Sequence, residues 1–208
     1  HNLNAFLSLI TDKTKLIFIA NPNNPTGTLI KKKILKDFLD NVPKSIVVVL
    51  DEAYDEYLDE SLKSDSFRWL NDYKNLIVSR SFSKAYGLAG LRIGYGVSSS
   101  ELIELMNRVR QPFNVNYLAQ IAATASLSDK KFIEESRKIN NTGMKQLTDA
   151  FKILNLEFIP SYGNFVSFKL ADENTAMMYY QHLLNNGVIV RPIANYGLPE
   201  FLRVSVGL

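Results

Sequence analysis

The sequence of 208 residues contains no cysteine and only two histidines, His1 and His182. The absence of cysteine excludes disulfide bonds, thiolate metal ligands and a cysteine nucleophile. So few histidines also argue against a histidine-rich metal centre. We therefore expect no bound metal in the functional site.

Long apolar runs and an excess of one charge are also missing. No stretch has the length of a membrane-spanning helix, and the first residues lack the basic and apolar regions of a signal peptide. The chain has 24 basic against 21 acidic side chains. The one basic run, Lys31–Lys33 with Lys36, has the pattern of the solvated face of an amphipathic helix. We expect no membrane or nucleic-acid partner and a cytoplasmic location.

Hydrophobic residues make up 46% of the chain, which suffices for one or two domains with a buried core. Apolar strand-like runs alternate with helical patterns in the first half, which is typical of a mainly parallel sheet. The expected strands are 16–20, 46–50, 76–78 and 93–97, and the expected helices are 31–42 and 102–109, the latter with a capping box at Ser98 and Glu101.

The second half has a different pattern. Asp129 is a candidate N-cap for one long helix that reaches Leu154, weakened locally by Gly143. Strand signals follow around 165–170, 188–190 and 202–206, with a helix over 175–185. We predict an α/β fold in which residues 1–110 form part of a large domain and residues 111–208 form an inter-domain helix and a small α+β domain.

Lys84 stands out among the candidate functional residues. It lies in Ser-Arg-Ser-Phe-Ser-Lys-Ala-Tyr-Gly, residues 79–87, directly after an apolar strand. Ser81, Ser83 and Arg92 flank it, and hydroxyls with a guanidinium suit a phosphate monoester. An amine beside an anion site indicates pyridoxal phosphate, whose aldehyde needs an amine. The competing interpretation is an ordinary lysine in a serine-rich loop.

Asp51 ends the apolar run 46–50 and is followed by Glu52-Ala53-Tyr54. The run has the composition of a strand buried on both faces, so a carboxylate there needs a cationic or donor partner. A pyridinium N–H would be such a partner. The alternative is a magnesium-binding carboxylate of a nucleotide hydrolase, but the chain lacks the glycine-rich loop ending in Gly-Lys-Ser or Gly-Lys-Thr.

The segment Asn21-Pro-Asn-Asn-Pro-Thr-Gly27 follows the first strand. Ligands of open α/β sheets bind beyond the carboxyl ends of strands, so Asn24 could present its amide to a cofactor oxygen. The same residues are good turn formers, and a simple turn remains the alternative.

These motifs, in this order, resemble those of fold-type I pyridoxal-phosphate aminotransferases: Asn-Pro-Thr-Gly at 24–27, Asp-Glu-Ala-Tyr at 51–54, and Ser-Phe-Ser-Lys at 81–84 with Arg92. The tail, Gly-Val-Ile-Val-Arg-Pro at 187–192, Tyr-Gly-Leu-Pro at 196–199 and Leu-Arg-Val-Ser-Val-Gly at 202–207, is most similar to histidinol-phosphate aminotransferases. The resemblance implies the fold of that family, a mainly parallel large domain with helices on both faces and a smaller C-terminal domain.

The resemblance also implies a role for each residue. Lys84 would bind the cofactor as an internal aldimine and move the substrate's Cα proton, and Asp51 would pair with the ring nitrogen. Asn24 and Tyr54 would bind the phenolic oxygen. The remaining residues would bind anions: Ser81, Ser83 and Arg92 the cofactor phosphate, and Arg191 and Arg203 the phosphate of the substrate or a carboxylate of the 2-oxo acid. For Arg191 the alternative is a surface arginine at the end of a strand.

The expected reaction is ping-pong transamination between histidinol phosphate and 2-oxoglutarate, in histidine biosynthesis, by a homodimer. Members of the family carry further segments before and after the matching region, so we expect a chain incomplete at both ends. Two alternatives stay open. One is an aromatic aminotransferase or phospho-amino-acid decarboxylase of the same fold, and the other is a non-catalytic cofactor-binding domain.

Overall fold

The computed structural model describes residues 1–207. Contacts divide the chain into two compact units, which are described separately. The first unit comprises His1–Asn21 and Ile30–Ile133. The second comprises Pro22–Leu29 and Glu134–Leu208, of which Leu208, the end of the second predicted domain, lies outside the described residues. Within the described range, no helix has both the length and the apolar character needed to cross a membrane.

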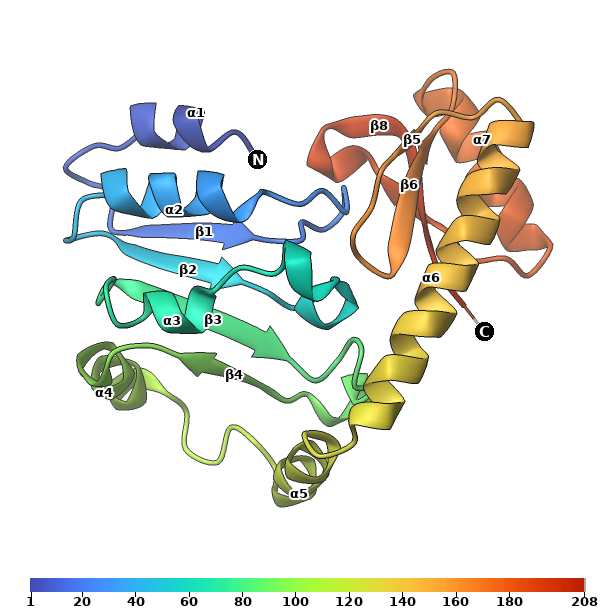
Figure 1. The fold of residues 1–208 in the computed structure, drawn as a ribbon. Helices are drawn as coiled ribbons and strands as arrows, with labels where there is room; N and C mark the ends of the chain where they lie inside the picture. Colours follow the sequence, from blue (N-terminus) through green and yellow to red (C-terminus); the bar gives the residue numbers. More distant parts are fainter. Residues whose placement is uncertain (208) are drawn as a thin grey trace. The chain divides into compact units, whose positions relative to one another are not determined.

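A four-stranded sheet forms the centre of the first unit (Figure 1). Its order is β1-β2-β3-β4, with β1, β2 and β3 parallel and β4 antiparallel to β3. The prediction of a mainly parallel sheet is therefore confirmed. The strands are β1 (Leu16–Ala20), β2 (Val47–Asp51), β3 (Leu76–Ser81) and β4 (Gly94–Val97).

Helices connect and cover these strands. Lys33 and Lys36 lie on the exposed face of α2 and form ion pairs with Asp37 and Asp40, so the basic run is a solvated helix face as predicted. The helices of this unit are α1 (Leu3–Ser8), α2 (Lys32–Asn41), α3 (Ser66–Trp69), α4 (Ser100–Val109) and α5 (Tyr117–Ser126), with short 3-10 turns η1 (Asp55–Tyr57), η2 (Glu60–Leu62) and η3 (Ala89–Leu91).

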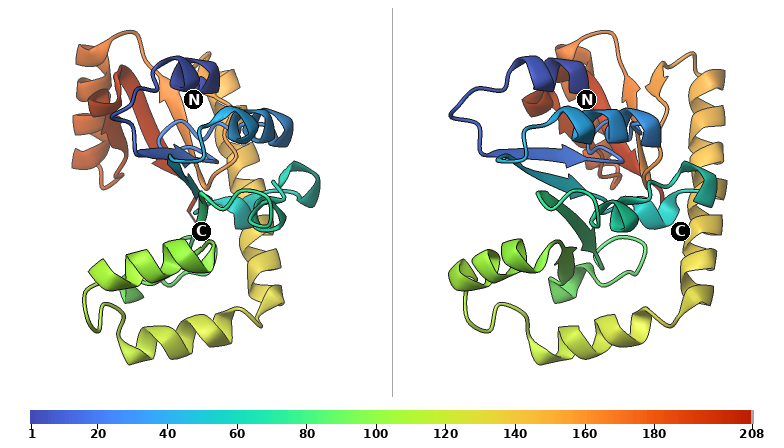
Figure 2. Two further views of the ribbon diagram at one scale, coloured as in Figure 1. Left: turned by 90° about the vertical axis from the view of Figure 1, so that its left-hand side faces the viewer. Right: turned by 60° about the vertical axis from the view of Figure 1, so that its left-hand side comes forward.

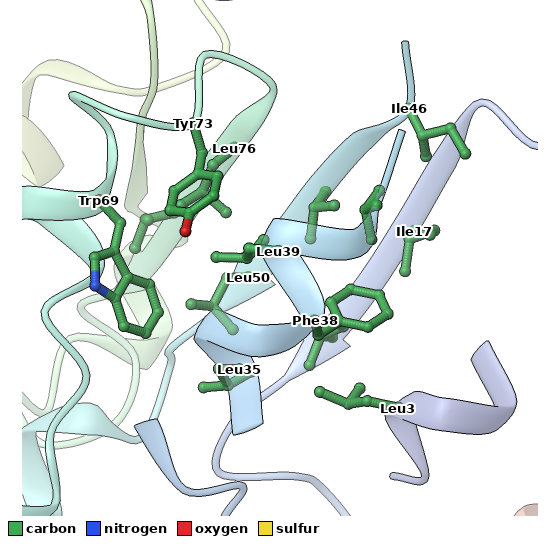
Figure 3. Close-up of a cluster of buried hydrophobic side chains, with 14 residues drawn as sticks. Leu3, Ile17, Leu35, Phe38, Leu39, Ile46, Leu50, Trp69, Tyr73 and Leu76 are labelled. Carbon is green, nitrogen blue, oxygen red and sulfur yellow. The ribbon is translucent and has the colours of Figure 1, made fainter. Parts of the chain in front are cut away.

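The core of this unit lies between α2 and the sheet. Leu35, Phe38 and Leu39 are at helical spacing on α2, and each is at most 4% exposed. Figure 3 shows these side chains gathered with those of the strands and of α1. This packing fixes the strands, and with them the loops that follow their carboxyl ends.

The second unit has an antiparallel sheet of order β5-β6-β8-β7. Asp129 accepts a hydrogen bond from Phe132 N and so caps α6, which runs unbroken in Figure 2. Gly143 is needed there because a Cβ would collide with Val206. Helix α6 (Lys130–Ile153) begins in the first unit and continues into the second, whose other elements are β5 (Phe158–Ile159), β6 (Phe165–Lys169), α7 (Glu173–Asn185), β7 (Arg191–Ile193), η4 (Ala194–Tyr196) and β8 (Leu198–Ser205).

Two local predictions were wrong. Ser99, not Ser98, caps α4 by accepting from Leu102 N, because the Ser98 hydroxyl instead donates to the carbonyl oxygen of Leu76. Residues 188–190 are β-rich in sequence but form no strand; pairing with β8 begins at Arg191. In both cases a partner distant in the sequence decides the local conformation.

Candidate functional site

The carboxyl ends of the parallel strands meet at one edge of the first sheet. Asn21 N donates to Asp51 O at 2.8 Å, and Glu52 N donates to Ser79 O at 3.0 Å. The hydrogen bonding therefore continues one residue beyond β2, and it holds the segment after β2 beside β3 and the loop that carries Lys84. This is the edge at which open α/β sheets bind ligands.

Lys84 lies in a tight loop that two backbone hydrogen bonds hold in place. Its carbonyl oxygen accepts from Gly87 N at 2.9 Å, and Leu88 N donates to Phe82 O at 2.9 Å. Phe82 is buried and anchors the loop, and its ring lies 5.0 Å from that of Tyr86. The Lys84 side chain is half-buried, and its amine lies 5.3 Å from the ring centroid of Tyr54. The backbone hydrogen bonds thus fix the loop, and the cation–π contact with Tyr54 orients the amine.

The predicted phosphate-binding residues come from both sides of this loop. Ser81 ends β3, and its hydroxyl accepts from Ser83 N at 3.1 Å. Phe82 lies between the two serines, and its N–H donates to Ile93 O. Because Ile93 directly follows Arg92, this hydrogen bond places the backbone at Arg92 beside the serine segment. Two hydroxyls and an arginine therefore come from adjacent backbone segments.

Arg92 has an unusual backbone conformation, with φ 53° and ψ 50°. A residue with a Cβ rarely adopts this left-handed region, and such strain is concentrated at functional sites. The exposed guanidinium donates to Ala89 O at 2.8 Å, which directs the side chain back over its own turn. The strain supports a functional role for Arg92.

Asp51 is exposed, so the expected cost of a buried carboxylate does not arise there. β2 is fully buried on one face only, and Asp51 lies on the other face. Its Oδ1 accepts from Ala53 N at 3.1 Å. A fixed, accessible carboxylate at this edge can still accept a hydrogen bond from a protonated ring nitrogen.

Glu52 is the buried acid that the sequence interpretation missed. It is 1% exposed and forms an ion pair with Arg80, which also contacts Asp55 and Glu56. Strand alternation could have found it, because Val48, Leu50 and Glu52 share the buried face of β2 and its extension. Burial raises the pKa of Glu52, and the nearby Arg80 guanidinium opposes that rise.

Two arginines face each other in the second unit. Arg191 on β7 and Arg203 on β8 are directly opposite in an antiparallel pair, so both side chains project from the same face of the sheet. Arg203 also lies 4.9 Å from the ring centroid of Phe165. Two guanidinium groups on the same face of a sheet can bind one anion together, so this pair is a candidate anion site.

The loop Pro22–Leu29 belongs to the same unit as these arginines. Arg203 Nη1 donates to Asn24 Oδ1, and Ser167 Oγ donates to Pro25 O at 2.7 Å. Gly27 has φ +74°, and a Cβ there would collide with Ser161. The loop is therefore more than a simple turn, because contacts with β6, β8 and the segment before β6 fix its backbone, and the contact with Arg203 on β8 fixes the Asn24 side chain.

The structure thus gathers the predicted residues in two groups. The first unit carries Asp51, Tyr54, Ser81, Ser83, Lys84 and Arg92, and the second carries Asn24, Arg191 and Arg203. Among the described residues, no cluster of histidine, aspartate and glutamate has the arrangement of a metal site.

Comparison with known proteins identifies relatives over the whole sequence. A family model described as aminotransferase class I and II matches residues 1–208. The chain is 60% identical to the histidinol-phosphate aminotransferase of Methylobacillus flagellatus over 208 residues, which are 100% of this chain and 55% of that protein. It is 54% identical to histidinol-phosphate aminotransferase 1 of Cupriavidus pinatubonensis, covering 100% and 56%.

Solved structures show the same similarity. The histidinol-phosphate aminotransferase of Sinorhizobium meliloti, in complex with pyridoxal-5'-phosphate, has a TM-score of 0.91 at 28% identity and covers 99% of this chain and 56% of its own. The enzyme from Clostridium acetobutylicum has a TM-score of 0.88 at 27% identity, covering 99% and 62%. The chain spans about half the length of the curated relatives that it matches.

Proposed function

The chain belongs to the aminotransferase class I and II family, and from that membership we propose that the whole protein catalyses pyridoxal-phosphate-dependent transamination. The proposed amino donor is histidinol phosphate, and the proposed acceptor is 2-oxoglutarate. The products are imidazole acetol phosphate and glutamate, in histidine biosynthesis. The observation that carries the substrate assignment is the 60% identity over all 208 residues to a histidinol-phosphate aminotransferase.

The residues of the first unit fit the cofactor. Lys84 offers a half-buried amine for the aldehyde, and Asp51 offers an exposed carboxylate for the pyridinium. The hydroxyls of Ser81 and Ser83, next to the backbone of Arg92, suit the phosphate. When bound, pyridoxal phosphate supplies an electrophilic aldehyde and a ring that withdraws electrons from the substrate Cα.

The protein's own groups then have distinct roles. Lys84 would hold the cofactor's aldehyde through its Nζ, and the same amine would move the proton of the donor's Cα. Asp51 would accept a hydrogen bond from the ring N–H and so keep the ring nitrogen protonated. Tyr54, whose ring lies against the Lys84 amine, would donate a hydrogen bond from its hydroxyl to the phenolic oxygen.

We assign the residues of the second unit to binding. Arg191 and Arg203 bind the phosphate of histidinol phosphate and, in the second half-reaction, a carboxylate of 2-oxoglutarate. We assign Asn24, whose Oδ1 accepts from Arg203, to binding the cofactor's phenolic oxygen. A homodimeric state and a cytoplasmic location complete the proposal, on the family resemblance alone.

Visible absorption of the full-length protein tests this function. We expect a cofactor band with pyridoxal phosphate, conversion to the pyridoxamine form by histidinol phosphate, and recovery on adding 2-oxoglutarate. Lys84→Ala should abolish the cycle, whereas Lys33→Ala, at an exposed lysine of α2, should retain it.

The substrate and the reaction type are tested separately. A band that does not respond to histidinol phosphate but responds to an aromatic amino acid would contradict the substrate. Release of carbon dioxide would indicate a decarboxylase, and the absence of any band would contradict the cofactor.

A further inference from the structure

Arg80 is surrounded by three acidic side chains, and we call these four residues the Arg80 cluster. Its Nη2 lies 2.7 Å and its Nε 2.9 Å from Glu52 Oε2. Its Nη1 lies 2.8 Å from Asp55 Oδ2 and 3.2 Å from Glu56 Oε1. All three nitrogens of the guanidinium are therefore engaged. The arginine side chain is 12% exposed, and the acidic ones are 9% exposed or less.

Neighbouring groups complete the cluster on its acidic side. Ser64 and Ser66 donate hydroxyl hydrogen bonds to Glu52 at 2.5 and 2.9 Å. Lys63 lies 3.9 Å from Asp55, and the Phe67 ring centroid lies 4.9 Å from the guanidinium carbon. Desolvating this many charges often costs as much as their attraction returns, so stability alone is a weak reason for such a cluster.

The position of the cluster suggests another reason. Three of its members directly adjoin proposed site residues in the chain: Glu52 follows Asp51, Asp55 follows Tyr54, and Arg80 precedes Ser81. The acidic members all lie in the segment after β2, and Arg80 lies on β3, which leads into the Lys84 loop. The cluster therefore joins the two segments that carry the proposed cofactor ligands of this unit.

We propose that Arg80 is a positioning residue, which holds the Asp51–Tyr54 segment against the Ser81–Lys84 loop so that both engage one cofactor. This inference rests on the proposed function. The fork of the guanidinium is essential to it, because Nη2 and Nε bind Glu52 while Nη1 binds Asp55 and Glu56. The single ammonium of a lysine would keep the charge but could not span these partners.

The test uses full-length protein with three variants: Arg80→Lys, Asp55→Asn and, as a matched control, Arg68→Lys at an exposed arginine on α3. Three quantities are measured: the unfolding temperature without cofactor, the Kd for pyridoxal phosphate, and the pH midpoint of the bound cofactor's absorption. The last two report the placement of the ligands rather than stability.

For Arg80→Lys we expect a folded protein with at least tenfold weaker cofactor binding and a shifted absorption midpoint. Asp55→Asn should change both in the same direction but less, and Arg68→Lys should match the parent. A lower unfolding temperature with Kd within twofold of the parent and an unchanged midpoint would show that the cluster is only structural and overturn the proposal.

Two further outcomes are decisive. If Arg80→Lys fails to fold, Asp55→Asn decides, and parental binding and midpoint in that variant would overturn the proposal. If the parent protein itself gives no cofactor band, the proposed function fails and the positioning role fails with it. If the parent binds cofactor and transaminates while the variants bind it equally well, only the positioning role is contradicted.

Discussion

Arg191 and Arg203 lie directly opposite each other on the antiparallel strands β7 and β8. Opposed residues of such a pair have Cβ atoms about 5 Å apart, and like charges there are destabilising. An anion that contacts both guanidinium groups would offset this repulsion. The register of the two arginines therefore supports the proposal that they bind an anion together.

Replacing one of these arginines should separate stability from binding. We expect Arg191→Gln to leave the unfolding free energy unchanged or to raise it by roughly 0.2–1 kcal/mol, because the repulsion is removed. The KM for histidinol phosphate should rise roughly 10- to 100-fold, the equivalent of a lost charged hydrogen bond. Lys169→Gln, on β6 of the same sheet, is the control. An unchanged KM would remove Arg191 from the substrate site.

Asp51→Asn tests the proposed partner of the ring nitrogen. Because Asp51 is exposed and asparagine can still accept from Ala53 N, the variant should fold normally. We expect kcat/KM to fall roughly 10- to 100-fold, since a charged hydrogen bond to the ring is lost. Asp72→Asn, at another exposed aspartate, should have parental kinetics. Equal rates in the two variants would contradict the role of Asp51.

The core prediction compares two neighbouring residues of α2. Leu35 is 2% exposed, whereas Ile34 is 50% exposed. Leu35→Ala should lower the unfolding free energy of the full-length protein by about 2–5 kcal/mol, because it leaves a cavity under the helix. Ile34→Ala should cost roughly 0.5 kcal/mol or less. Denaturant unfolding measures both, and equal losses would contradict the packing in Figure 3.

Glu56 gives a prediction about pH. Burial raises the pKa of its carboxyl, and the Arg80 guanidinium acts in the opposite direction. When the pKa of a carboxyl is higher in the folded state than in the unfolded state, the free energy of unfolding falls as the pH rises. The fall begins near the unfolded-state pKa, about 4.3, and is complete above the folded-state pKa. Each unit of elevation corresponds to about 1.4 kcal/mol.

Glu56→Gln should therefore be more stable than the parent at neutral pH, and the difference should vanish below about pH 4. Urea unfolding at several pH values measures it. Glu101→Gln, at an exposed glutamate of α4, serves as the control. A constant difference between parent and Glu56→Gln at every pH would show that the buried charge is not its source.

Much of the fold could be predicted because local patterns agree with the tertiary structure. β1 has the predicted bounds, and Asp129 caps α6 as expected. The sequence also places Lys84 in a loop after a strand, as the structure does. Local spacing sufficed in these cases because the residues that decide the conformation are close together in the chain.

Other features depend on contacts between distant residues. The ion pairs of Arg80 join β3 to the segment after β2. The loop around Asn24 is fixed by Ser167 and Arg203, which come more than 140 positions later in the chain. The run before Asp51 is apolar at every position, so the run itself does not show the alternation that places Glu52 inside. Such pairings cannot be read from spacing along one segment, because the fold itself brings the partners together.

Chemical reduction provides the most direct test of the role of Lys84. The full-length protein is incubated with pyridoxal phosphate, treated with borohydride to fix any carbon–nitrogen double bond between lysine and cofactor, digested and analysed by mass spectrometry. We predict one pyridoxyl adduct, on the peptide that contains Lys84, and its loss when histidinol phosphate is added before reduction. An adduct on a different lysine, or none at all, would contradict the assignment of this site.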